Sequence, residues 1–243
     1  MGSRGAHRAG RGNRRPGEGE WPATSPVGRL GPSDRAHLLG LGVPVTHPAD
    51  RVLMREAERT DHVLILLDGL VKVTGHADDD RAALLAVRMR GDLLGELAAL
   101  DGGPRSATVT TCGAVRTRTV SRADFLRCMR ERPGIAYAVN QSVVAKLRAA
   151  NTHRVNFVGC DAATRLARVL HHLAVTYGER DGDSAVLRWP ITQPELATLA
   201  GASEPSVQKA LRRLRHDGVL STGYRSIRID SFARLIAFAY PVE

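Results

Sequence analysis

The sequence predicts an α+β chain with three parts: an N-terminal β-roll (jelly roll), a long helix, and a C-terminal winged helix-turn-helix. Short apolar runs broken by turn residues occupy residues 47–120 and predict the roll. A seven-residue repeat between residues 135 and 158 is typical of a long helix. Two capped helical segments flank Gly201 and precede a hairpin pattern, and this order predicts the helix-turn-helix and its wing.

The composition narrows the class of protein. The 243 residues suffice for one or two domains, and they include no apolar run long enough to span a membrane. The basic N-terminus has no apolar segment, so it is not a secretory signal. The formal net charge of +10 favours a polyanionic partner, most often nucleic acid. The scattered Cys112, Cys128 and Cys160 indicate a reducing cytoplasm and no metal, haem or iron-sulfur cluster.

The first 27 residues are rich in Gly, Arg and Pro, and we expect a disordered basic tail over residues 1–27. The tail is either a solvated extension or a segment that touches DNA phosphates. A short helix is expected at residues 33–39, with Ser33 or Asp34 as its N-cap.

Residues 28–134 are expected to form the roll domain. Ser121 is expected to cap a helix over residues 123–130, which Pro133 and Gly134 then end. Asp78–Asp80 is expected at a loop tip. The expected strands include residues 63–67, 70–73, 83–87 and 115–120.

One segment of the roll domain, GDLLGELAALDGGPRSATVTT at residues 91–111, suits a small phosphate that carries a sugar. The backbone at Gly95 can approach a phosphate because no side chain blocks it. Arg105 can donate two hydrogen bonds to phosphate oxygens, and Ser106 adds a hydroxyl. Glu96 would repel phosphate but can accept a hydrogen bond from a ribose hydroxyl. This combination predicts a nucleotide site; the alternative is ordinary turns with a surface ion pair between Glu96 and Arg105.

The segment as a whole resembles the phosphate-binding cassette of the cyclic-AMP receptor protein (CRP/FNR) family of transcription regulators. VLILLDGLVKV at residues 63–73 also resembles the family's second hairpin. The resemblance implies that residues 28–134 bind a cyclic nucleotide, with cyclic AMP as the first candidate. It also implies that residues 135–158 form the dimerisation helix, whose middle closes the nucleotide pocket.

The resemblance carries the helix contacts of the family onto Lys146, Ala150 and Asn151. Asn151 can reach an adenine edge across the dimer, because its amide both donates and accepts hydrogen bonds. Ala150 has no such group, whereas well-studied relatives place a hydroxyl there. The sequence therefore leaves open a ligand other than cyclic AMP, such as a different cyclic nucleotide.

A heptad pattern on the long helix predicts a dimer. The repeat comprises Ala136, Val143, Ala150 and Phe157, with Asn140, Leu147 and Arg154 between them. Such spacing predicts that two copies of the chain pack along this face. The alternative is a helix that packs on its own roll.

Residues 159–243 are expected to form the winged helix-turn-helix domain. An amphipathic helix over residues 161–175 is followed by a loop over residues 178–184. Thr192 and Glu195 then form a capping box. Gly201 supplies the tight turn, Ser203 caps the second helix, and residues 219–229 read as the wing. The alternative is a small helical bundle with a solvated basic face.

The second of these helices carries the residues expected at DNA. The resemblance places base-reading positions at Glu204, Pro205 and Lys209, with Gln208 at a further readable site. Arg212 and Arg213 are expected to hold phosphates. The full expected set is Thr192, Ser203, Glu204, Ser206, Gln208, Lys209, Arg212 and Arg213.

These observations predict a homodimeric regulator whose affinity for a pseudo-palindromic operator in double-stranded DNA depends on a bound cyclic nucleotide. RNA polymerase is an expected further partner. A ligand-independent DNA binder with a vestigial pocket remains an alternative, as does a cyclic-nucleotide-binding regulatory subunit of an enzyme. An enzyme in its own right is not expected, because we find no catalytic triad, Cys/His pair or metal-ligand spacing in the sequence.

Overall fold

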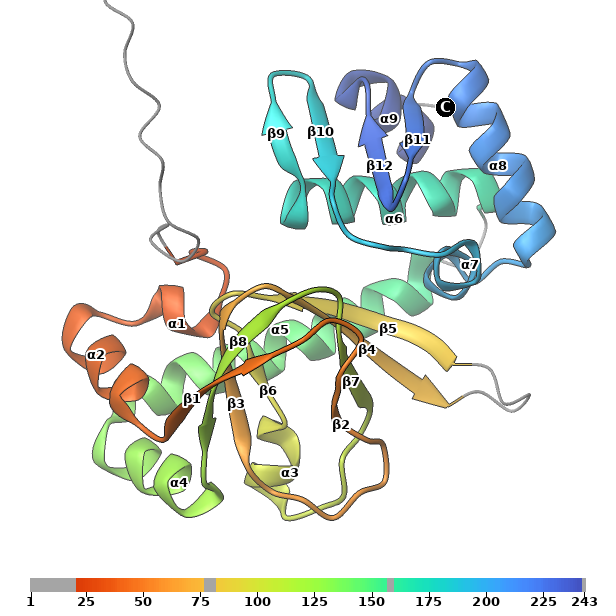
Figure 1. Cartoon of the computed structure of the whole chain (residues 1–243). Helices are drawn as coiled ribbons and strands as arrows, with labels where there is room; N and C mark the ends of the chain where they lie inside the picture. Colours follow the sequence, from red (N-terminus) through yellow and green to blue (C-terminus); the bar gives the residue numbers. More distant parts are fainter. Residues whose placement is uncertain (1–20, 77–81, 157–159, 242–243) are drawn as a thin grey trace, which may run out of the picture.

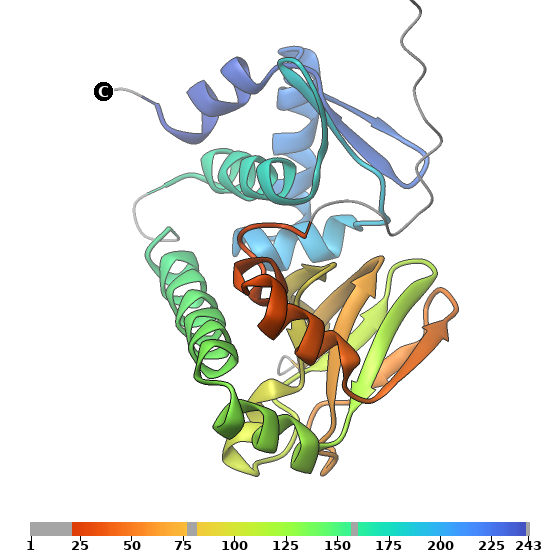
Figure 2. The same ribbon diagram turned by 90° about the vertical axis from the view of Figure 1, so that its left-hand side faces the viewer.

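The computed structural model describes residues 21–76, 82–156 and 160–241. It has a β-roll flanked by helices, a long helix α5 (Pro133–Asn156) beside the roll, and a C-terminal domain of helices and a small sheet (Figure 1). In Figure 2, α5 runs along one flank of the roll, and α7 (Gln193–Ala200) lies between the roll and the rest of the C-terminal domain. In the described ranges, no helix is both long and apolar enough to cross a membrane.

The folded part of the chain begins earlier than expected. Residues 21–27 were expected in the tail, yet helix α1 (Pro26–Arg29) already belongs to the roll domain. Val27 is fully buried among the helices beside the roll, and this apolar contact explains why the segment is held. Residues 1–20 of the expected tail lie outside the described residues.

Two helices begin at prolines, ahead of the expected positions. Helix α2 (Pro32–Gly40) has Gly31 as its N-cap, not Ser33 or Asp34. Helix α5 (Pro133–Asn156) begins at Pro133, which was expected to end the preceding helix. Proline suits a first helical turn, because its missing N–H would have no partner there in any case. The expected helix over residues 123–130 is α4 (Arg122–Glu131), with Ser121 as its cap.

The roll consists of two antiparallel four-stranded sheets, with strand orders β1-β8-β3-β6 and β2-β7-β4-β5. Strand β3 is apolar from Val63 to Leu67 and ends at Asp68, and its first four residues are buried on both faces. Val63 and Ile65 pack against the helices, whereas Leu64 and Leu66 pack between the sheets. The strands are β1 (Val43–His47), β2 (Val52–Met54), β3 (Val63–Asp68), β4 (Leu70–His76), β5 (Ala82–Met89), β6 (Leu93–Leu94), β7 (Thr108–Thr111) and β8 (Val115–Val120). The expected loop tip at Asp78–Asp80 lies outside the described residues.

The C-terminal domain is a winged helix-turn-helix with more strands than expected. The loop predicted over residues 178–184 contains a hairpin, which pairs with the wing in a sheet of order β11-β12-β10-β9. The C-terminal helix α9 was not expected either. The elements are α6 (Ala162–Tyr177), β9 (Glu179–Asp181), β10 (Ser184–Leu187), α7 (Gln193–Ala200), α8 (Glu204–His216), β11 (Leu220–Gly223), β12 (Ser226–Ile229) and α9 (Phe232–Ala239).

The turn between α7 and α8 follows the expected chemistry. Thr192 and Glu195 form the capping box at the start of α7. Gly201 ends α7 with a positive φ of 54°, a conformation that glycine adopts without a Cβ penalty. The Ser203 hydroxyl accepts a hydrogen bond from the Ser206 N–H and so caps α8. The predicted helix-turn-helix is therefore confirmed in its caps and its turn.

Candidate functional site

A cavity of about 370 Å³ lies where the roll, α5 and the C-terminal domain meet. Five of the six residues predicted to bind ligand line it, namely Gly95, Glu96, Arg105, Ser106 and Lys146. The sixth, Asn151, is exposed on α5 and does not line this cavity.

Arg105 is fixed at the cavity wall by four hydrogen bonds. Its side chain is buried to 3% exposure. Nε donates to the Thr60 hydroxyl over 2.9 Å, and Nη1 donates to the Gly95 carbonyl over 3.0 Å. Nη2 donates to the His62 carbonyl over 2.7 Å and contacts the ring nitrogen Nδ1 of His62 at 3.3 Å. Burial lowers the pKa of Arg105, although arginine remains charged near neutral pH.

Gly95 permits this close approach. It caps the short helix α3 (Glu96–Asp101) with a positive φ of 77°. A Cβ at this position would collide with Nη1 of Arg105 and with the methyl group of Met54. A phosphate was expected to approach the backbone at Gly95; in this structure the group that approaches it is the Arg105 guanidinium, and phosphate binding there stays a prediction.

Glu96 is bound to Lys146 rather than to Arg105. Its side chain is 4% exposed, and Oε1 accepts a hydrogen bond from Nζ of Lys146 over 2.8 Å. Nζ also donates to the Leu93 carbonyl over 3.0 Å. The alternative of a surface ion pair between Glu96 and Arg105 is therefore wrong. Because a carboxylate has two oxygens, Oε2 of Glu96 can still accept from a ribose hydroxyl.

The long helix has one face packed against the roll domain and one exposed face, and the predicted heptad coincides only in part with the exposed face. Ile135 and Val139 are buried against the roll, and Ala136 and Val143, expected at the dimer seam, are half-buried. The exposed apolar positions are Tyr137 (66%), Val144 (47%) and Leu147 (61%). Asn140 and Asn151 are also exposed, so the exposed heptad is 137, 144, 151 with 140 and 147 between them. Ala150, also expected at the seam, is exposed, and Phe157 lies outside the described residues, so the position of the seam stays a prediction.

Helix α8 presents most of the expected DNA-binding residues to solvent. Its buried face consists of Val207, Ala210, Leu211 and Leu214. Among the expected residues on this helix, Pro205, Gln208, Lys209, Arg212 and Arg213 are exposed. Glu204 and Ser206 are half-buried, and the hydroxyls of Ser203 and Ser206 bond to each other at 2.9 Å. Thr192 is exposed at the start of α7.

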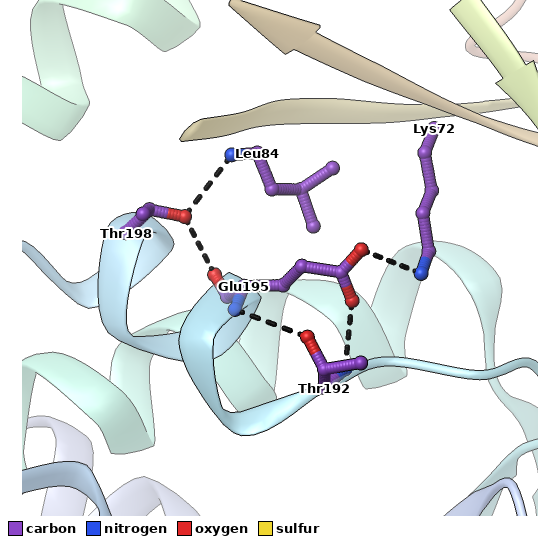
Figure 3. Close-up of polar contacts among 5 residues, drawn as sticks. All are labelled: Lys72, Leu84, Thr192, Glu195 and Thr198. Carbon is purple, nitrogen blue, oxygen red and sulfur yellow. Dashed lines mark hydrogen bonds and ion pairs between the residues drawn. The ribbon is translucent and has the colours of Figure 1, made fainter. Parts of the chain in front are cut away.

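Contacts between the two domains were not anticipated. Nζ of Lys72 on β4 lies 2.6 Å from Oε1 of Glu195 on α7, with both side chains largely buried (Figure 3). The Leu84 N–H of β5 donates to the Thr198 hydroxyl over 3.0 Å (Figure 3). The Tyr177 hydroxyl of α6 donates to the Val87 carbonyl over 2.7 Å. The C-terminal domain is thereby anchored to the second sheet of the roll.

The groups that hold Arg105 were also missed. Thr60 and His62 precede Arg105 by more than forty residues, and nothing in their local sequence indicates the contact. Burial and the neighbouring Arg105 lower the pKa of His62, which favours the neutral imidazole. A neutral Nδ1 without a proton can accept from the guanidinium.

Comparisons with known proteins agree with this arrangement. Residues 44–132 match the model of the cyclic nucleotide-binding domain, and residues 164–238 match the Crp-like helix-turn-helix domain. A CRP-like cAMP-activated global transcriptional regulator of Mycobacterium tuberculosis is 31% identical over 204 residues, which cover 84% of this chain and 91% of that protein. The cyclic AMP receptor protein of Thermus thermophilus is 25% identical over 194 residues, covering 80% and 87% of the two chains.

Solved structures share the fold. FixK2 from Bradyrhizobium japonicum superimposes with a TM-score of 0.70 at 20% identity, covering 84% of this chain and all of that chain. TTHB099, a CRP-family transcriptional regulator from Thermus thermophilus, gives a TM-score of 0.68 at 22% identity, covering 80% and 96%. With a nucleotide-binding domain followed by a Crp-like helix-turn-helix, the chain belongs to the CRP/FNR family of transcription regulators.

Proposed function

We propose that this protein is a homodimeric DNA-binding transcription regulator whose DNA affinity is controlled by a cyclic nucleotide bound beside Arg105, with cyclic AMP as the first candidate. The observation that carries the proposal is the pair of buried side chains, Arg105 and Glu96, on the wall of one cavity. Residues 44–132 match the cyclic nucleotide-binding model, and the relative from Mycobacterium tuberculosis is described as cAMP-activated.

The bonding of Arg105 supports an anionic ligand. Its four hydrogen bonds end on neutral groups: a hydroxyl, two carbonyls and an imidazole. These bonds hold the guanidinium in place, and none of them is to a carboxylate, although Asp61, Glu58 and Glu96 are close enough to counter in part the lowering of the Arg105 pKa by burial. A phosphate at the cavity would add a directly bonded anion, and the Ser106 hydroxyl lines the same cavity. Lys146 adds a second cation beside Glu96.

Titration calorimetry with 3′,5′-cyclic AMP, cyclic GMP, cyclic CMP and linear AMP tests the ligand. We expect a cyclic nucleotide to bind and Arg105→Ala to abolish binding, since a charge-assisted contact is worth about 1.5–3 kcal/mol. Glu96→Ala should weaken binding as well. Tyr224→Ala, at the exposed wing tip, is the control and should leave nucleotide affinity unchanged. Absence of binding by the wild-type protein at millimolar nucleotide would overturn the ligand assignment.

The dimer is supported by the exposed apolar heptad on α5. Tyr137, Val144 and Leu147 are large apolar side chains that a second copy would cover. Asn151 on the same face would then reach the nucleotide of the partner chain. A two-fold dimer presents two copies of α8 and predicts half-sites whose centres lie roughly 34 Å apart, one helical turn of DNA. We also propose RNA polymerase as a partner and the cytoplasm as the location.

A second candidate function is DNA binding without a ligand. It is favoured by Ala150, which offers only a methyl group to a base, and by the internal bonds of Arg105 and Glu96. It predicts that DNA affinity is the same with and without nucleotide. A regulatory subunit of an enzyme is less favoured, because residues 164–238 match the Crp-like helix-turn-helix model.

A further inference from the structure

The C-terminal domain forms part of the wall of the nucleotide cavity. Helix α6 contributes His172, Leu173 and Tyr177, and α7 contributes Leu199. Leu173 and Leu199 are buried, whereas His172 is exposed, with its ring edge-on to Tyr177 at 6.5 Å between centroids. A ligand that fills the cavity would therefore meet the DNA-binding domain of its own chain.

Strand β5 of the roll, which lies beside this wall, contains a β-bulge. Val73 pairs with Ala86 and Thr74 pairs with Leu84, so Leu85 is an extra residue on β5. The Leu85 side chain lines the cavity and is 51% exposed. The neighbouring Leu84 N–H donates to the Thr198 hydroxyl of α7 (Figure 3). The bulged strand thus lines the ligand space from Leu85 to Arg88 and holds the DNA-binding domain through the preceding residue, Leu84.

The chemistry of the cavity differs between the roll and the C-terminal domain. Arg105, Ser106 and Glu96 supply the polar groups that suit phosphate and ribose. Leu173 and Leu199 supply apolar surface, and the His172 imidazole adds a flat aromatic ring with polar edges. A nucleobase is itself flat, with apolar faces and polar edges. Since Ala150 offers only a methyl group, α5 of the same chain has little with which to read a base.

We infer that the base of the bound nucleotide is held by the DNA-binding domain of the same chain, against His172 of α6, while phosphate and ribose bind to the roll. This inference rests on the proposed nucleotide ligand and adds the residues that read its base. The ligand then bridges both domains directly. Ligand affinity and the docking of α7 on β5 become linked equilibria, each strengthening the other by the same factor.

Photolabelling of the full-length protein tests the contact. The probe is 8-azido-cyclic AMP, which attaches covalently to residues beside the adenine when irradiated. Trypsin releases residues 169–180 as one peptide, because Arg168 and Arg180 flank it, and this peptide contains His172, Leu173 and Tyr177. We expect label in this peptide that excess cyclic AMP prevents. Specific label confined to α5 and the roll would overturn the inference while leaving the ligand assignment intact.

Two substitutions test the same contact by affinity. His172→Ala should weaken cyclic AMP binding at least about fivefold and change the preference among cyclic nucleotides. His171→Ala is the matched control, because the His171 ring packs edge-on against Phe232 and Tyr240, away from the cavity. The preference among bases is a readout that a general loss of packing would not move. If His172→Ala binds cyclic AMP as tightly as the wild-type protein and keeps the same preference among cyclic nucleotides, the inference is overturned.

Linkage is tested at a residue outside the cavity. Thr198→Val keeps the shape of the side chain but removes the acceptor of the Leu84 N–H. We expect nucleotide affinity to fall about fivefold although Thr198 does not line the cavity. Unchanged affinity in this variant would contradict the linkage. If the wild-type protein binds no nucleotide, the proposed function and this inference both fail.

Discussion

Arg105→Met tests whether the guanidinium has a structural role apart from ligand binding. Methionine fills much of the same volume, so the cavity contribution is small. The substitution removes four hydrogen bonds, to the Thr60 hydroxyl, to the carbonyls of Gly95 and His62, and to Nδ1 of His62. Thr60 is exposed and Gly95 and His62 are half-buried, so water can reach these acceptors and the net value of each bond applies. At the low end of about 0.5–1.5 kcal/mol for each bond, the loss is roughly 2 kcal/mol.

Urea unfolding followed by circular dichroism measures this loss. A domain of ordinary stability, about 5–15 kcal/mol, would remain folded with a lower midpoint and an unchanged m-value. Ser106→Ala is the control: Ser106 is exposed at the same cavity, so its loss should change stability by less than about 0.5 kcal/mol. A loss below about 1 kcal/mol in Arg105→Met would refute the claim that these bonds hold the pocket without a ligand.

Three further predictions follow from α5, His62 and α8. Leu147→Glu would place two charges at the dimer seam, and light scattering should show monomers at micromolar concentration where the wild-type protein is dimeric; a wild-type monomer would contradict the assembly. Burial and Arg105 lower the pKa of His62 below 6.5, so neutral His62 contributes stability above that pH that is lost as the pH falls below it. Thermal unfolding of His62→Gln should therefore lose less stability than wild type between about pH 7 and about pH 5.5, and an identical loss would refute the assignment. In anisotropy titrations, Lys209→Ala should relax specificity at one base pair by about 1–3 kcal/mol, whereas Arg212→Ala should weaken all sequences alike and lower the salt slope by roughly one. A loss of affinity in Arg212→Ala that depends on the base at one position would contradict the assignment of Arg212 to a phosphate.

Local signals in the sequence were sufficient to predict the helix-turn-helix. The capping box of Thr192 and Glu195 acts over three residues, and Gly201 sets its turn through its own φ angle. Ser203 and Ser121 likewise cap their helices through neighbours three residues away. Such interactions are complete within a short window, so residue type and spacing specify them.

Contacts between distant segments escaped prediction. Lys72 and Glu195 are 123 residues apart, and Thr60 lies 45 residues before Arg105. Hairpin β9–β10 is stabilised by pairing with the wing, a partner that its own residues do not reveal. Tertiary packing determines each of these contacts. A single sequence shows which segments have an apolar face to bury, but it does not show which distant segment packs against that face.

For residues 91–111, the sequence predicted which residues line the cavity but not how they are bonded. Its residue types predicted Gly95, Glu96, Arg105 and Ser106 at one cavity, and all four line it. Their bonds without a ligand were not predictable, because they depend on His62 and on Lys146 of α5. The position of the dimer seam on α5 stays a prediction: the heptad gives a periodicity, but packing within the chain decides how exposed Ala136 and Val143 remain, and both are half-buried.

DNA affinity measured as a function of nucleotide concentration tests the central claim most directly. Fluorescence anisotropy would follow wild-type protein on operator DNA obtained by selection from random sequences, with cyclic AMP, cyclic GMP and cyclic CMP titrated in turn. We predict that one cyclic nucleotide changes DNA affinity saturably by at least about fivefold, and that Arg105→Ala removes the change. An affinity for the selected DNA that is independent of every nucleotide tested would contradict the account and establish ligand-independent binding.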